Sequence, residues 1–216
     1  LKRLRERIRQ HAAPALRGDG DLRKRILAIL PFAPTRAQAR VAAEVARDIA
    51  KPAPMLRLVQ GDVGSGKTVV AALAALGAVE SGFQAALMAP TELLAEQHYR
   101  NFRHWLEPLG VEVVWLAGKL KGRARSTALA QIAGSDEARS AQVVIGTHAL
   151  MQEGVAFRDL ALVIIDEQHR FGVHQRLALR DKGRVTDGVP HQLVLTATPI
   201  PRTLAMTAYA DLDVSV

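Results

Sequence analysis

The sequence predicts an α/β fold, in which a mostly parallel sheet is covered by helices on both faces and preceded by a short helical segment. Short continuous apolar runs alternate with amphipathic helical stretches through most of the 216 residues. This alternation is typical of parallel strands that are buried on both faces and joined by helical crossovers. A glycine-rich loop, GDVGSGKT, lies between the first apolar run and a helical stretch and favours the same class.

Each element is expected where its pattern is strongest. Thr35 suits the N-cap of a helix from Arg36 to Ala50, and a shorter helix from Leu22 to Leu30 is expected before it. The expected strands are Met55–Gln60, Ala85–Ala89, Val111–Leu116, Gln142–Gly146, Leu162–Asp166 and Gln192–Thr196. The expected helices are Lys67–Glu80, Glu92–Trp105, Gly122–Ala133, Val173–Arg180 and Arg202–Tyr209.

Composition narrows the classes of protein. There is no cysteine, which excludes disulfides, iron–sulfur clusters and cysteine zinc sites and fits a reducing cytosol. No apolar run is long enough to span a bilayer, and no signal peptide is visible. The first residue is Leu rather than Met, so we expect a piece of a longer chain.

The charge of +8 is concentrated at one end of the chain. Residues 1–30 hold nine Lys or Arg and three acids, so they carry +6 and the remaining residues carry +2. We therefore expect a basic helical segment over residues 1–30 and a main domain over residues 31–216. An amphipathic helix with Leu1, Leu4 and Ile8 inward, or a nucleic-acid contact, would each explain the basic segment.

The glycine-rich loop matches the phosphate-binding pattern G-x-x-x-x-G-K-[ST]. Glycines let the backbone curl so that its N–H groups point at phosphate oxygens, and the following helix aims its positive end at the same anion. The expected cofactors are ATP and Mg²⁺, with Lys67 on the phosphates and Thr68 on the metal. The expected binding residues are Gly61, Asp62, Val63, Gly64, Ser65, Gly66, Lys67 and Thr68.

Asp166 and Glu167 follow a buried strand in LVIIDEQHRFGVHQR. Beside a phosphate-binding loop, Asp166 is placed to hold Mg²⁺ together with Thr68, and Glu167 to orient and deprotonate the attacking water. The alternative is a pair of acids that caps the next helix. A zinc site at His169 and His174 lacks a third ligand by spacing. We expect His169 to link the nucleotide site to Thr196–Thr198 by hydrogen bonds.

Four segments in order carry a family resemblance: GDVGSGKT, APTELLAEQHYRNF, IIDEQHRFGVHQR and LTATPIPRTLAMTAYADLD. Together they resemble the first RecA-like domain, a P-loop NTPase domain, of superfamily 2 DNA helicases. The form DEQH followed by RFGVHQR resembles the RecG family of branched-DNA translocases. The resemblance covers about Leu30 to Val216.

The resemblance implies further site residues. Phe32 would stack on adenine and Gln38 would hydrogen-bond its edge, whereas the residues alone favour a core Phe and an exposed helical Gln. Lys67, Asp166, Glu167 and His169 would form the catalytic set. Thr196, Ala197 and Thr198 would couple nucleotide state to DNA movement. The implied DNA contacts are Pro90, Thr91, Glu92, Lys119, Lys121, Arg123, Gly146, Thr147 and His148.

The resemblance also implies partners outside these residues. An arginine finger would come from a second RecA-like domain, so residues 1–216 alone are expected to hydrolyse ATP hardly at all. Residues 1–30 would be the connector from an upstream DNA-wedge domain. Branched or duplex DNA is the implied substrate, with no membrane partner, and the family implies a monomer in the bacterial cytosol or nucleoid.

Three functions remain open from the sequence. The RecG resemblance implies fork regression and Holliday junction branch migration in DNA repair and recombination. The transcription-repair coupling factor shares the RFGV and TATPIPRT segments, although Gln168 and the continuation HQRLAL favour RecG. A nucleotide switch or docking module that does not hydrolyse ATP is the alternative of another class.

Overall fold

A single sheet organises the computed structural model, which describes residues 12–135, 140–166, 188–197 and 213–215. Within these residues seven strands lie in the order β3-β4-β2-β5-β6-β1-β7, and every pair is parallel. The prediction of a mostly parallel sheet is therefore confirmed. The strands are β1 Leu56–Gln60, β2 Gln84–Met88, β3 Val113–Leu116, β4 Val143–Gly146, β5 Leu160–Asp166, β6 His191–Thr196 and β7 Asp213–Ser215.

The described helices alternate with the strands as expected. The helical runs predicted at Lys67–Glu80 and Gly122–Ala133 are confirmed at both bounds. Those predicted at Val173–Arg180 and Arg202–Tyr209 lie outside the described residues. The α-helices are α2 Asp21–Ile29, α3 Arg36–Ile49, α4 Lys67–Glu80, α5 Glu92–Leu106 and α6 Gly122–Ala133, and the 3₁₀ helices are η1 Glu107–Leu109 and η2 His148–Met151.

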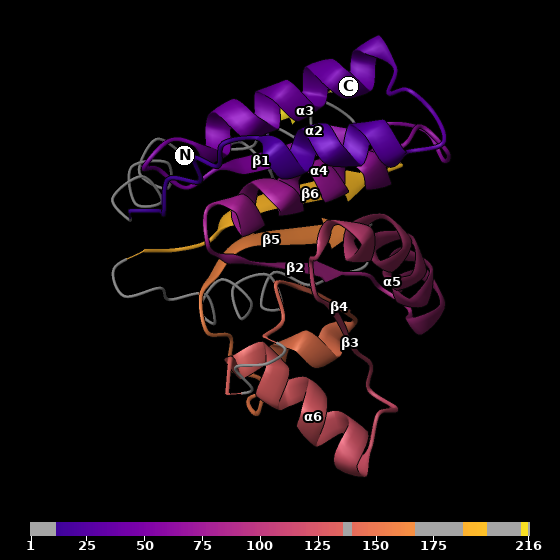
Figure 1. Ribbon diagram of the computed structural model, residues 1–216, viewed down its shortest axis with the longest axis vertical. Coiled ribbons are helices and arrows are strands. Elements are labelled where there is room, and N and C mark those ends of the chain that lie inside the picture. The colour runs from indigo at the N-terminus through magenta and orange to yellow at the C-terminus, as the bar shows by residue number, and fades with distance from the viewer. Residues whose placement is uncertain (1–11, 136–139, 167–187, 198–212, 216) are drawn as a thin grey trace, which may run out of the picture.

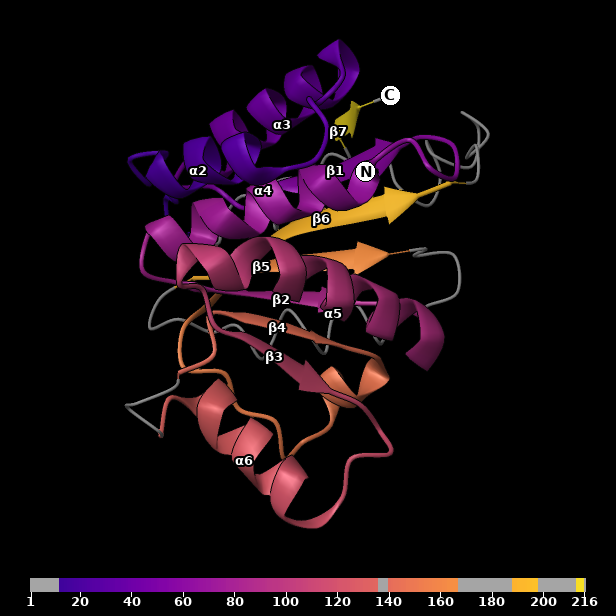
Figure 2. The same cartoon turned by 45° about the vertical axis from the view of Figure 1, so that its right-hand side comes forward.

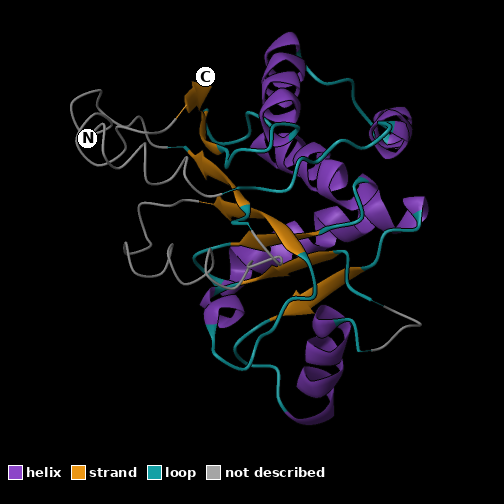
Figure 3. Ribbon diagram, turned by 90° about the vertical axis from the view of Figure 1, so that its left-hand side faces the viewer, coloured by secondary structure: helices purple, strands orange, loops and turns teal. Residues whose placement is uncertain are grey.

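Helices cover both faces of the sheet (Figures 1 and 3). On one face α2, α3, α4 and α5 enclose a large apolar cluster that includes Leu76 and Phe102. On the other face α6 and η2 enclose a second cluster that includes Ile132 and Leu150. The expectation of a two-sided arrangement is confirmed in the described part of the chain.

Helix α4 is the most deeply buried helix of the first face, because every residue from Val69 to Val79 is buried. A helix that is apolar all round must be enclosed on every side. It runs between the sheet and helices α2 and α3 (Figure 2). Its polar last residue, Glu80, pairs with Arg23 of α2 at 3.5 Å. Because α4 is packed on all sides, the position of the glycine-rich loop that precedes it is fixed.

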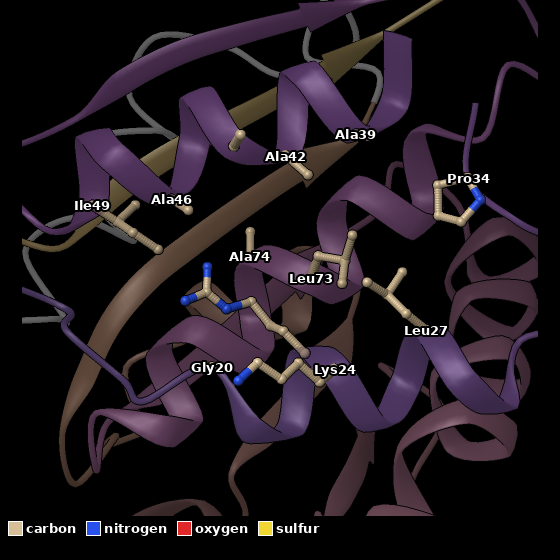
Figure 4. Close-up of a pocket in the computed structure, with 12 residues that line it drawn as sticks. Gly20, Lys24, Leu27, Pro34, Ala39, Ala42, Ala46, Ile49, Leu73 and Ala74 are labelled. Carbon is tan, nitrogen blue, oxygen red and sulfur yellow. The ribbon is translucent and has the colours of Figure 1, made fainter. Parts of the chain in front are cut away.

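Residues 12–30 pack into the same core. Leu16 and Ile26 are buried, and the Leu16 amide donates to the Ile49 carbonyl at 2.8 Å. The boundary expected near Pro31 is therefore not a gap in packing for residues 12–30. The role of residues 1–30 as a connector stays a prediction. Between α2, α3 and α4 the small side chains of α3 leave an apolar hollow, lined by Leu27, Ala42 and Leu73 among others (Figure 4).

Strand β7 was not expected from the sequence. It has three residues, and half of the Val214 surface is exposed, so no apolar run marks it. It forms a strand because residues Asp213–Ser215 pair in parallel with Arg57–Val59 of β1. No helix in the described ranges is both long and apolar enough to cross a membrane.

His191 ties the N-terminal segment to the sheet. Its Nδ1 accepts from the Met55 amide at 3.0 Å, so Nε2 carries the proton and donates to the Pro14 carbonyl at 2.8 Å. Burial lowers the pKa of His191, while the Pro14 carbonyl and the charge of Asp48 act in the opposite direction. The folded chain therefore holds this imidazole neutral.

We expect the folded chain to lose stability as pH falls below about 6.5, the ordinary pKa of histidine. The unfolded chain takes up the proton first, because the pKa of His191 is lower in the folded state, and this favours unfolding. Urea denaturation at pH 7.5 and pH 5.5 measures the effect. His191→Asn, which cannot titrate, should be less stable at pH 7.5 but should lose less on acidification. An equal loss in both proteins would contradict the assignment.

Candidate nucleotide and nucleic-acid site

The described site segments at the ends of strands β1 to β6 lie at one edge of the sheet. Because the strands are parallel, their carboxyl ends meet at the same edge (Figure 2), where open α/β sheets bind ligands. The glycine-rich loop follows β1, Asp166 ends β5 and Thr196 ends β6. The three predicted DNA-binding segments follow β2, β3 and β4. By these predicted roles, the edge divides into a nucleotide half at β1, β6 and β5 and a DNA half at β2, β4 and β3, and the two halves meet where β5 pairs with β2.

The glycine-rich loop has a left-handed backbone at two of its glycines. Gly64 and Gly66 have φ of 82° and 80°, a region that other residues rarely adopt. Gly66 is the N-cap of α4. The Lys67 amine donates to the carbonyls of Gly61 and Asp62 at 2.7 and 2.9 Å. The lysine is thus held over its own loop, where phosphate oxygens can replace the two carbonyls.

Gln38 connects helix α3 to this loop. Its side-chain oxygen accepts from the Thr35 amide at 2.9 Å, which completes a capping box and confirms Thr35 as N-cap. Its side-chain nitrogen donates to the Ser65 carbonyl at 2.8 Å. Both ends of the amide are therefore engaged within the protein, and its contact with adenine stays a prediction. Phe32 is 43% exposed and available for stacking.

Asp166 ends β5 with its carboxylate nearly buried. It is 9% exposed, and its Oδ2 lies 2.7 Å from Nε2 of His98 on α5. Sequence reasoning missed His98, although a polar residue in the apolar stripe of a helix could have signalled it. Glu167, His169 and Thr198 lie outside the described residues. Thr196 is buried, and its carbonyl accepts from the Gly61 amide at 3.2 Å.

Thr68 and Asp166 fit a Mg²⁺ site by chemistry and by position. Both offer hard oxygen donors, which Mg²⁺ prefers, and Mg²⁺ keeps several waters that can bridge to a more distant carboxylate. Strand β6 lies between β1 and β5, so the two strands are about 10 Å apart. That spacing suits a directly bound hydroxyl and a carboxylate that acts through water. The metal assignment stays a prediction.

The DNA half of the edge combines exposed cations with buried loop residues. Lys119 pairs with Glu92 at 2.9 Å, and this hydrogen bond, with a smaller contribution from His148, holds the pKa of Glu92 below its ordinary value. Lys121 and Arg123 are exposed at the start of α6 and have no ion pair in the described part of the chain.

The other predicted DNA-binding residues differ in exposure. Thr91 is exposed, but its hydroxyl already caps α5 by accepting from the Leu94 amide. Thr147 is 2% exposed, which counts against a direct contact by its side chain, and Gly146 is buried beside the Leu116 carbonyl, which counts against a direct contact by its backbone. His148 is exposed, and Pro90 is partly buried.

Comparison with known proteins places the chain in a family. The DEAD/DEAH box helicase family model matches residues 32–207. The ATP-dependent DNA helicase RecG of Pasteurella multocida is 62% identical over 216 residues, which are 100% of this chain and 31% of that protein. The protein of the same name from Escherichia coli K12 is 65% identical over 208 residues, which are 96% of this chain and 29% of that protein.

A solved structure agrees with this placement. The structure of RecG bound to a three-way DNA junction has a TM-score of 0.84 and 42% sequence identity, and the match covers 99% of this chain and 27% of that one. The chain thus spans about a third of the length of the curated relatives it matches.

We expect Gly66→Ala to lower the affinity for ATP at least about tenfold, which corresponds to about 1.4 kcal/mol. A Cβ at Gly66 would lie 2.1 Å from the Gln38 side-chain nitrogen, so the loop and Gln38 must separate. Gly82→Ala is the matched control, since Gly82 has φ of 82° and a Cβ there would meet no atom within 4 Å in the described structure. Fluorescence anisotropy of a labelled ATP analogue measures both, and equal affinities would contradict the role of Gly66.

Proposed function

The chain belongs to the DEAD/DEAH box helicase family, and we propose that it is the ATP-binding half of an ATP-dependent helicase that remodels branched DNA. It corresponds to the first RecA-like domain of RecG proteins. The observation that carries the proposal is the shared carboxyl edge, where a phosphate-binding loop and a cationic surface lie on one parallel sheet. In such an arrangement, nucleotide binding at one half of the edge can change how tightly the other half binds DNA.

On the nucleotide half, each residue has a distinct role in binding or hydrolysing ATP. The N–H groups of the loop and the Lys67 amine bind the phosphates, and Lys67 exchanges its contacts with Gly61 and Asp62 for phosphate oxygens. Thr68 and Asp166 would hold Mg²⁺, and the metal would supply positive charge against the charge that develops on the phosphates. Glu167 orients and deprotonates the water.

Hydrolysis would need a part from elsewhere in a longer protein. The stabilising cation of the transition state, an arginine finger, would come from a second RecA-like domain. Closure of the two domains on ATP and opening after hydrolysis would alternate their grips on duplex DNA. Stepping along the duplex would then drive a branch backwards, as in fork regression or branch migration. Work of this kind in repair and recombination belongs in the bacterial cytosol or nucleoid.

On the DNA half, the exposed cations Lys121 and Arg123 support a grip on phosphates rather than on bases. Contacts of this kind are independent of sequence and weaken with salt. The names of the relatives, with the junction complex among the solved structures, support branched DNA over the linear duplex on which a transcription-repair coupling factor would act.

The ATPase rate of the full protein tests the proposal with forked DNA, linear duplex DNA and structured RNA at two salt concentrations. We expect strong stimulation by the fork, weak stimulation by the linear duplex and none by RNA. Equal stimulation by fork and duplex would favour the coupling-factor alternative. Glu167→Gln should abolish turnover and keep ATP binding. No stimulation by any polymer, with an unaffected Glu167→Gln variant, would favour the nucleotide switch.

We expect the double substitution Lys121→Ala, Arg123→Ala to weaken binding to all duplex sequences and to reduce the salt dependence. Removing one phosphate-binding side chain should lower the slope of log K against log salt by about one. Arg47→Ala on α3 is the control, since Arg47 is exposed but lies outside both the three loops and the basic segment 1–30. Salt titrations of binding to a labelled fork give the slopes. A slope unchanged from the unsubstituted protein would exclude both side chains from the interface.

A further inference from the structure

His98 occupies a position in α5 that packing alone would give to an apolar residue. The buried residues of this helix are Ala95, His98, Phe102 and Leu106, which form one stripe toward the sheet. Only 7% of His98 is exposed. Polar side chains in such stripes need partners, because the loss of water is otherwise unfavourable. The partner that His98 has is the carboxylate proposed to hold Mg²⁺.

The direction of the hydrogen bond follows from the chemistry of the two groups. An ionised Asp166 carboxylate can only accept, so His98 donates from Nε2 across the 2.7 Å to Oδ2. The other ring nitrogen, Nδ1, is buried and has no hydrogen-bond partner among the described residues. A side chain that only filled space would not need a buried hydrogen-bond partner at this position.

Helix α5 connects the His98–Asp166 hydrogen bond to the DNA half of the edge. It begins at its N-cap Thr91, directly after β2, and its first residue Glu92 is paired with Lys119 of the loop after β3. His98 is seven residues from Thr91, which is about 10 Å along a rigid helix. A DNA strand that binds to Thr91, Glu92 or Lys119 would therefore displace the helix that holds Oδ2 of Asp166.

We propose that His98 is a positioning residue that couples DNA binding at the start of α5 to the orientation of the Asp166 carboxylate. The inference rests on the proposed function and assigns a route for its regulation. With the hydrogen bond made, Oδ2 is fixed and the carboxylate has one orientation about its Cβ–Cγ bond. A small displacement of α5 on DNA changes the length of that hydrogen bond, and so the orientation of Asp166 toward the metal.

The experiment compares His98→Phe and His98→Gln in the full protein. Phe fills the ring volume but cannot donate, whereas the Gln side-chain amide can donate to Asp166. His104→Gln is the control, since His104 lies on the same helix and is exposed. Three quantities are measured: the Mg²⁺ concentration that half-saturates binding of fluorescent ADP, the affinity for forked DNA, and the ratio of ATPase rates with and without the fork.

We expect His98→Phe to raise the half-saturating Mg²⁺ concentration about 10–100-fold, the usual effect of removing a residue that orients a metal ligand. The stimulation by forked DNA should fall at saturating Mg²⁺, while the affinity for DNA stays within about twofold, because no DNA-binding residue is altered. His98→Gln should recover part of both losses, and His104→Gln should match the unsubstituted protein.

Three results would overturn the proposal. One is unchanged Mg²⁺ dependence and stimulation in His98→Phe. Another is a change in Mg²⁺ dependence with normal stimulation, which would leave an orienting role but no coupling. The third is a parallel loss of DNA affinity, Mg²⁺ binding and thermal stability that Gln does not recover, which indicates a structural role.

Two further measurements separate this inference from the proposed function. If the unsubstituted protein shows no DNA-stimulated turnover, the proposed function and the coupling both fail, while the Mg²⁺ dependence still reports on the contact with Asp166. Long-range ¹H–¹⁵N spectra of the unsubstituted protein identify the protonated ring nitrogen of His98 without any variant. A proton on Nε2 is expected, and a neutral ring protonated on Nδ1 would overturn the proposal.

Discussion

The parallel direction of the strands is the constraint on which the site depends. Parallel pairing brings the carboxyl ends of β1 to β6 to one edge, although their loops are far apart in the sequence. The phosphate-binding loop and the Asp166 carboxylate lie at the same edge because one parallel strand, β6, lies between β1 and β5 and holds them about 10 Å apart. An antiparallel neighbour in either place would send one of these groups to the opposite edge.

Packing beneath the edge gives the loops a rigid base. Helix α4 has no exposed face, so the loop that enters it cannot shift without disturbing the core. Next to the edge strand β7, Arg57 of β1 pairs with Asp48 and Glu44 of α3 and donates a hydrogen bond to Ser215 of β7. Burial disfavours the charged form of Asp48, yet hydrogen bonds from Lys51 and Arg57 hold its pKa below its ordinary value. This network joins the edge strand β7 to α3.

Features encoded by local pattern were predictable from the sequence, and features created by tertiary contact were not. The glycine-rich loop, the Thr35 cap and the strand before Asp166 each rest on a short run of residues and appear where expected. Strand β7 depends on pairing with β1, which is about 150 residues away in the chain. The packing of Leu16 and Ile26 depends likewise on distant partners. For residues 12–30, the charge pattern indicated a basic segment but did not indicate that Leu16 and Ile26 enter the core.

The contact of His98 with Asp166 was not predictable from the sequence, because it too depends on tertiary packing. The resemblance predicts a DNA-binding motif in APTELLAEQHYRNF, at the start of α5, but the partner of His98 lies 68 residues away. Asp166 pairs with Leu195 in the register of β5 and β6, and the next residue, Thr196, bonds through its carbonyl to Gly61 of the loop. The nucleotide half is therefore connected on two sides, to the end of β6 and to α5. A signal from DNA that used only the Thr196 side would need no polar residue at position 98, and the buried imidazole is the reason to place a second route through α5.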